Sequence, residues 1–184
     1  TAHGIDLLLT WWVANRIGKP RMPIWYNPIL APDITLADNQ LLPGFPDWQV
    51  MYTPGHTDHH HAYLIDTPVQ KFLFTGDALL IESCGRTDFQ SGDAETLYNS
   101  IHNKIFSLPD ETLVYPGHDY VSRFITTVAQ EKARNPRLGG GRSKQEFVEI
   151  MNNLDLPYPR KIDFAVPGNE KCGQCPDNIP EGLK

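Results

Sequence analysis

The sequence has little cysteine, no excess of positive charge and no long apolar run. Three cysteines among 184 residues are too few for a disulfide scaffold. The formal net charge of −6 argues against a broad surface for nucleic acid or for an anionic membrane. The apolar run at residues 5–14 is shorter than the roughly 20 residues that cross a bilayer. We therefore expect neither a nucleic acid nor a membrane as partner.

The chain is expected to form one domain in a reducing compartment. Its 184 residues suit a single domain, and no repeat or long linker divides them, so we predict one domain over residues 1–184. No signal peptide or transit segment is visible, which favours the cytoplasm, or the mitochondrial matrix in a eukaryote. Cys84 is predicted to be a small buried apolar residue, and Cys172 and Cys175 are interpreted as reduced thiols rather than half of a zinc site.

Strands and helices are mixed along the chain, so the predicted class is α/β or α+β. Asp93 should cap one helix, and Ser143 with Glu146 should form the capping box of another. Helices are expected at residues 6–20, 93–108, 121–135 and 143–154, and strands at residues 22–26, 33–38, 47–53, 61–66, 71–77 and 112–117. The tail from Pro157 is rich in proline and glycine and is expected to wrap the surface.

Three polar residues each come directly after a glycine at the end of an expected strand: His56, Asp77 and His118. Glycine permits a sharp turn and a close backbone approach, and strand ends at one edge of a sheet converge. Alone, each residue is more often a solvated turn histidine or a capping aspartate. Asp77, however, lies between two apolar runs, where a buried carboxylate needs a partner. Two histidines and an aspartate suit non-haem Fe(II) or Zn(II), so together the three favour a metal site.

Several segments resemble a known superfamily. "TPGHT", "FTGD" and "YPGHDY" resemble the later metal motifs of the metallo-β-lactamases, and "CGRTDF" with "LPYPRKIDFAVP" is similar to the persulfide (sulfur) dioxygenases. The resemblance is dense from about Thr53 to Cys172. It implies a metallo-β-lactamase-type αββα sandwich. In that family a single Fe(II), held by two histidines and one aspartate, oxidises glutathione persulfide with O2 to sulfite and glutathione.

The resemblance implies a role for each matching residue. His56 and Asp77 correspond to iron ligands, and His118 corresponds to a further zinc ligand of dinuclear relatives. Asp119 is expected to orient a nearby histidine by a hydrogen bond, as metal-bound imidazoles usually require. One Fe(II) per chain is implied, with Zn(II) as the alternative. Three residues fall where the family binds glutathione or supports the metal: Arg86, Tyr120 and Thr57.

The first metal motif of the family, H-x-H-x-D-H, is degenerate here. Asp6 matches its aspartate, but His3 stands one place out of register, and a slip of one residue points a side chain the opposite way. The three histidine positions hold Ala2, Gly4 and Leu7. The strands that precede the motif in the family have no counterpart, so we expect an incomplete N-terminal part, with His3 as the nearest substitute ligand.

Three functions remain open at this point. The first is a persulfide dioxygenase that acts on glutathione persulfide and O2, either as a monomer or as a homodimer. The second is a zinc metallohydrolase of the glyoxalase II type, which hydrolyses glutathione thioesters, and the third is a catalytically impaired member without the first metal motif. Two local alternatives also remain. For Arg86, the alternative to binding substrate is a salt bridge with Asp88 or Asp93. For His59–His61, either one or two of the rings face solvent, or the run supplies a compensating ligand or an adventitious metal site.

Overall fold

The computed structural model describes residues 36–89 and 91–170. The described residues divide into two compact units, residues 36–154 and residues 155–170. The second unit contains helix α5 (Ile162–Glu170), so part of the tail that we expected to wrap the surface is helical. The expected helix at residues 6–20 and strand at residues 22–26 lie outside the described residues.

The first unit is built on a six-stranded mixed sheet. The strands lie in the order β1 (Leu41–Leu42), β2 (Phe45–Tyr52), β3 (His61–Asp66), β4 (Lys71–Gly76), β7 (Leu113–Pro116) and β8 (Thr126–Thr127). Neighbouring strands are antiparallel except for β4 and β7, which run parallel. Because β3 is antiparallel to both β2 and β4, the strands β2, β4 and β7 all end at the same edge of the sheet. That edge is where the candidate site lies.

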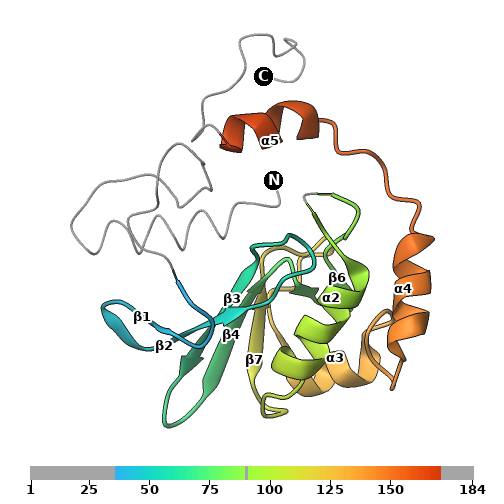
Figure 1. The fold of residues 1–184 in the computed structure, drawn as a ribbon. Helices are drawn as coiled ribbons and strands as arrows, with labels where there is room; N and C mark the ends of the chain where they lie inside the picture. Colours follow the sequence, from blue (N-terminus) through green and yellow to red (C-terminus); the bar gives the residue numbers. More distant parts are fainter. Residues whose placement is uncertain (1–35, 90, 171–184) are drawn as a thin grey trace. The chain divides into compact units, whose positions relative to one another are not determined.

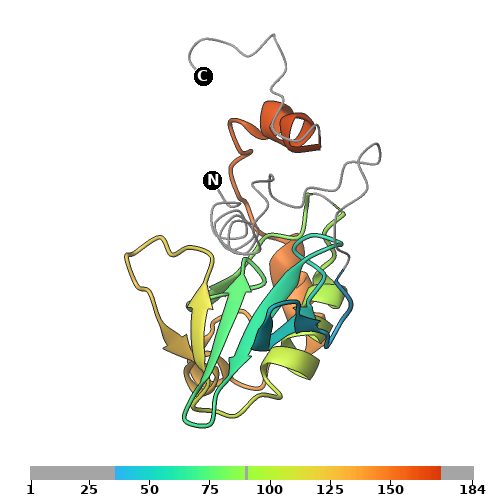
Figure 2. The ribbon, with the colours of Figure 1, turned by 90° about the vertical axis from the view of Figure 1, so that its left-hand side faces the viewer.

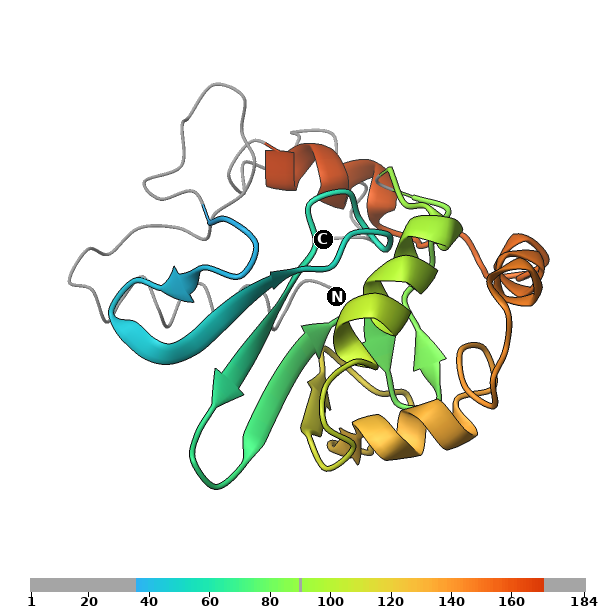
Figure 3. The same cartoon turned by 60° about the horizontal axis from the view of Figure 1, so that its bottom comes forward.

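Helices cover one side of this sheet (Figures 1 and 3). They are α2 (Ala94–Ser100), the π-helix η1 (Ile101–Ile105), α3 (Val128–Arg134) and α4 (Lys144–Asn152). The central strands bury alternate residues, as their period of two requires, and these pack against the helices: Ala62, Leu64, Leu73 and Val114 from the strands, and Leu97, Ile101, Val128 and Phe147 from the helices. A short hairpin, β5 (Leu79–Leu80) with β6 (Ser83–Cys84), follows Asp77. Mixed sheet and helices together confirm the α/β class.

The helix caps confirm two sequence predictions and correct a third. Asp93 caps α2, with its Oδ1 accepting from the Thr96 amide at 2.7 Å, and Ser143 and Glu146 form the capping box of α4. The helix expected at residues 121–135 begins only at Val128, because Thr126 pairs with Val114 as part of β8 and Thr127 caps α3. None of the described helices is long and apolar enough to cross a membrane.

Candidate metal centre

Three side chains meet at the edge where β2, β4 and β7 end. His56 lies in the loop after β2, Asp77 directly follows β4, and His118 follows β7 by two residues. Nε2 of His56 is 3.6 Å from Oδ2 of Asp77, and Nδ1 of His118 is 2.9 Å from Oδ1 of Asp77. The Asp77 side chain is only 5% exposed. The fold therefore places His56 and His118 beside the buried carboxylate of Asp77.

The Asp77 carboxylate is tightly enclosed and incompletely hydrogen-bonded. Its buried Oδ1 lies 2.9 Å from Nδ1 of His118, and among the described residues no other group donates a hydrogen bond to this oxygen. A Cβ atom on Gly117 would lie 2.6 Å from the same oxygen, so only glycine fits beside it. The Gly117 amide donates to the Gly76 carbonyl at 2.7 Å, which holds the two strand ends together. A buried carboxylate whose Oδ1 meets only an imidazole among the described residues is a group that a cation can also satisfy.

The tautomer of His56 is fixed by the backbone. Its Nδ1 lies 2.7 Å from the carbonyl oxygen of Arg86, and because that oxygen can only accept, Nδ1 carries the proton. Nε2 is the ring nitrogen that faces Asp77, and metal-ligating histidines bind through one nitrogen in this way while the other donates to a backbone carbonyl. Gly85 makes the approach possible, since its Cβ would lie 2.7 Å from His56 Nδ1 and 2.3 Å from the carbonyl oxygen of Asp77.

His60 is a positioning residue that the sequence analysis missed. It is 5% exposed; its Nε2 accepts from the Asp77 amide at 3.3 Å, and its Nδ1 then donates to Thr53 Oγ1 at 2.9 Å. Burial lowers the pKa of His60 to about 3, and the nearby His56 acts in the same direction, so the ring is neutral. His60 shares the buried face of Ala62 and Leu64, and this alternation was legible in the sequence. With both nitrogens engaged, His60 supplies no compensating ligand, and His59 is exposed.

His118 is held between Asp77 and Tyr120. Its Nε2 lies 2.8 Å from the Tyr120 hydroxyl, and the contact with Asp77 raises the pKa of His118. We expected Asp119 to hydrogen-bond a histidine, and this prediction is wrong. Its carboxylate instead accepts from the side chain of Arg123 and from the amides of Val121 and Arg123. These bonds to Arg123 hold the pKa of Asp119 at about 2.

Arg86 adopts the structural alternative raised by the sequence. Its Nε and Nη2 donate to the two oxygens of Asp88 at 2.6 and 2.7 Å, and its guanidinium lies 4.4 Å from the centre of the Phe89 ring. Thr57 shapes the turn through its carbonyl oxygen, which accepts from the Gly55 amide. Cys84 is buried as predicted, and burial raises the pKa of its thiol to about 11, so it is not a nucleophile.

A family model described as the metallo-beta-lactamase superfamily matches residues 5–118. The chain belongs to this superfamily. A solved structure shares its fold: the crystal structure of ETHE1 from Myxococcus xanthus is 48% identical, with a TM-score of 0.71, and the match covers 77% of this chain and 61% of that one. This agrees with the predicted fold family.

Two curated relatives within the superfamily bear on function. The mitochondrial persulfide dioxygenase ETHE1 of Homo sapiens is 53% identical over 121 residues, which are 66% of this chain and 46% of that protein. The hydroxyacylglutathione hydrolase GloC of Haemophilus influenzae is 40% identical over 130 residues, which are 68% of this chain and 55% of that protein. The chain thus spans about half the length of the curated relatives it matches. The resemblance to the persulfide dioxygenases is confirmed.

The donor set fits the metal that this superfamily implies, although it is not a complete cage. A histidine whose Nδ1 donates to a backbone carbonyl, with Nε2 facing a buried carboxylate, is a metal-binding arrangement. As they stand, however, no three His, Cys, Asp or Glu side chains among residues 36–89 and 91–170 are arranged to hold an ion. His3 and Asp6, predicted from the first motif, lie outside the described residues.

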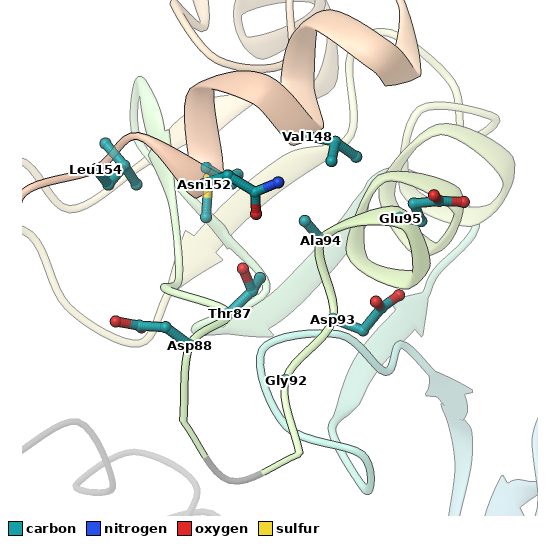
Figure 4. A pocket seen from close by; sticks show the side chains of 10 residues that line it. Thr87, Asp88, Gly92, Asp93, Ala94, Glu95, Val148, Asn152 and Leu154 are labelled. Carbon is teal, nitrogen blue, oxygen red and sulfur yellow. The ribbon is translucent and has the colours of Figure 1, made fainter.

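A separate pocket of about 360 Å³ lies between the loop that follows Arg86 and helix α4 (Figure 4). Thr87 and Asn152 point towards one another across it, and most of its wall is polar, with Val148 and Met151 of α4 among its apolar side chains. None of the residues gathered around Asp77 lines this pocket, so it is distinct from the candidate metal centre.

Proposed function

We propose that the protein to which this chain belongs is a non-haem iron persulfide dioxygenase, which oxidises glutathione persulfide with O2 to sulfite and glutathione. The observation that carries the proposal is the pair formed by His56, whose Nδ1 donates to the Arg86 carbonyl, and the buried Asp77, which Nε2 of His56 faces. The 53% identity to a persulfide dioxygenase supports the choice of reaction. One Fe(II) per chain, for a chain with a complete first motif, is part of the proposal, as is a cytoplasmic or mitochondrial-matrix location.

In this proposal His56 and Asp77 hold the metal. The third ligand belongs to the first motif, whose histidine positions here hold Ala2, Gly4 and Leu7, so we expect weak iron binding in the chain as written. Bound iron supplies the redox chemistry between O2 and the persulfide sulfur. The chain's own groups orient and tune the site: the Arg86 carbonyl fixes the His56 ring, and His60 holds the Asp77 backbone. His118 and Tyr120 form one wall, where the exposed Tyr120 ring can contact a thiol-bearing substrate.

Iron content and sulfite formation test the proposal directly. The chain as written and a version with histidine at positions 2, 4 and 7 are loaded anaerobically with Fe(II), and then glutathione persulfide and O2 are added. We expect the restored version to bind about one iron and form sulfite at roughly 1 s⁻¹ or more, with little iron or turnover in the unaltered chain. If the restored version binds iron but forms no sulfite, the dioxygenase assignment is wrong.

A zinc hydrolase is the second candidate, because the chain is also 40% identical to a hydroxyacylglutathione hydrolase. The same two loaded proteins distinguish the candidates. Hydrolysis of a glutathione thioester by the Zn(II) form, without sulfite formation by the Fe(II) form, would favour the hydrolase.

A further inference from the structure

The loop between β7 and β8, residues 117–125, carries His118 and Tyr120 yet is poorly anchored by packing (Figure 2). Four of its apolar side chains are at least half exposed: Tyr120, Val121, Phe124 and Ile125. Apolar burial therefore contributes little to fixing its position. Something polar must hold the loop if His118 is to stay beside Asp77.

The side chain of Arg123 connects this loop to the β5–β6 hairpin. Within its own loop it donates from Nη2 to Asp119 Oδ1 at 3.0 Å, and Asp119 in turn accepts from the amides of Val121 and Arg123. Towards the hairpin Arg123 donates from Nη1 to Glu82 Oε2 at 2.6 Å and from Nη2 to the carbonyl oxygen of Ile81 at 3.1 Å. One guanidinium thus ties the loop to the β5–β6 hairpin, using the fixed fork that lysine lacks.

The β5–β6 hairpin is itself attached to the candidate metal centre. It leads into Gly85, whose amide donates to the Asp77 carbonyl at 2.8 Å, and into Arg86, whose carbonyl fixes His56. The buried Glu131 also holds the hairpin, because its carboxylate accepts from the Glu82 amide at 2.9 Å. Arg123 therefore connects the two segments that supply His118 and the support of His56.

Both segments contain a backbone conformation that needs outside support. Ser122 has φ of 62° and Glu82 has φ of 53°, and neither is glycine. Such left-handed residues persist when surrounding contacts fix them. Arg123 is the residue directly after Ser122, and its side chain donates to the side chain of Glu82. Its contacts therefore support both of these left-handed residues.

We infer that Arg123 is a positioning residue that sets the place of His118 and Tyr120 at the metal centre by clamping their loop to the β5–β6 hairpin. The effect on metal binding rests on the proposed function, whereas the contacts of Arg123 that hold the loop do not. Loss of the Arg123 side chain should displace His118 and Tyr120 without unfolding the protein, because an ion pair of a partly exposed side chain contributes little to global stability.

Three variants of the full chain test this. Arg123→Met removes the fork, Arg123→Lys keeps the charge alone, and Lys132→Met is the matched control. Lys132 forms a 2.6 Å surface ion pair with Asp110, and its side chain is 37% exposed, as is that of Arg123. The measurements are hydrogen exchange of the Val121 amide, the ¹⁵N signals of the His118 ring at fixed pH without metal, and Co(II) affinity of the same variants in the version with the restored first motif.

We expect Arg123→Met to speed Val121 exchange at least tenfold and to shift the His118 signals. Because His118 contacts the ligand Asp77 at 2.9 Å, we also expect Co(II) binding to weaken at least fivefold, with Arg123→Lys in between and Lys132→Met unchanged. Unchanged exchange and His118 signals in Arg123→Met, or equal changes in Lys132→Met, would overturn the inference, as would normal Co(II) affinity in Arg123→Met. If the exchange and His118 respond but even the parent protein binds no cobalt, the proposed metal function fails and the clamp stands.

Discussion

The two sides of the candidate metal centre are built differently. On one side, His56 and Asp77 are enclosed by backbone: Gly85 and Gly117 lie so close that an added Cβ would overlap them. On the other side, His118 and Tyr120 lie on a loop with exposed apolar side chains, which a few polar contacts of Arg123 hold in place. The enclosed side tolerates no extra atom, whereas the loop side can shift when one side chain changes.

This difference suits a site that must fix a metal and admit a substrate. Ligands need positions accurate to a fraction of an ångström, and close-packed backbone provides that accuracy. A substrate wall gains from a segment that can adjust. The comparison predicts large structural costs for changes on the enclosed side and smaller, functional costs on the loop side.

The largest effect is expected from Gly85→Ala. Its Cβ would lie 2.3 Å from the Asp77 carbonyl oxygen, so the backbone must move and we expect a loss of about 3 kcal/mol in unfolding free energy. Gly140→Ala is the control, because its Cβ meets nothing within 4 Å and only its φ of 66° is unfavourable, at about 1 kcal/mol. Urea unfolding compares them. Equal costs would mean that the enclosed side is not crowded.

Asp77→Asn should affect the metal more than the fold. The amide has nearly the same shape but lacks the charge, so we expect metal affinity of the version with the restored first motif to fall about a hundredfold or more. The exposed Asp47→Asn is the control and should leave binding unchanged. Co(II) titration gives the affinities, and thermal unfolding shows that both variants fold. Binding that survives Asp77→Asn would remove this carboxylate from the site.

Sequence reasoning succeeded where short-range patterns decide the structure. Strand β3 has the predicted bounds, and the capping residues Asp93 and Ser143 act as expected, because alternation and caps are local properties. It failed where a distant partner decides. Nothing near Arg123 in the sequence indicates that its side chain reaches Glu82, 41 residues away. The strand-end residues were found because parallel strands bring their ends together whatever the loops do.

Buried polar residues were harder to assign, yet two carried a signal. His60 stands two residues before Ala62 on the buried face of β3. Glu131 stands three residues after Val128, on the buried face of α3, where it accepts from the Asn135 side chain at 2.8 Å. In both cases the periodicity of the element indicates a buried position for a polar residue.

The histidine run gives a graded test of the enclosed side. His60→Ala removes a buried ring and leaves the Asp77 amide and the Thr53 hydroxyl without their partners, so we expect a loss of about 2 kcal/mol. His59→Ala changes an exposed ring and should cost less than about 0.5 kcal/mol. Urea unfolding of the two variants gives the comparison. A larger cost at His59 would contradict the assignment of His60 as the support of Asp77.

The smallest stability effect is expected at Arg86, where the two interpretations of its side chain can be separated. The pair with Asp88 is bidentate, but Asp88 is 56% exposed, so a double-mutant cycle should give a coupling of about 0.5 kcal/mol. If Arg86 also binds a glutathione carboxylate, the substrate must compete with Asp88 for the guanidinium. In the version with the restored first motif, Arg86→Ala should then raise KM about tenfold with a smaller change in kcat, as loss of uniform binding requires. Asp88→Asn should lower KM, because it frees the fork. If instead both variants raise KM equally, the pair acts only as a unit that shapes the loop, and the carboxylate of the substrate is bound elsewhere.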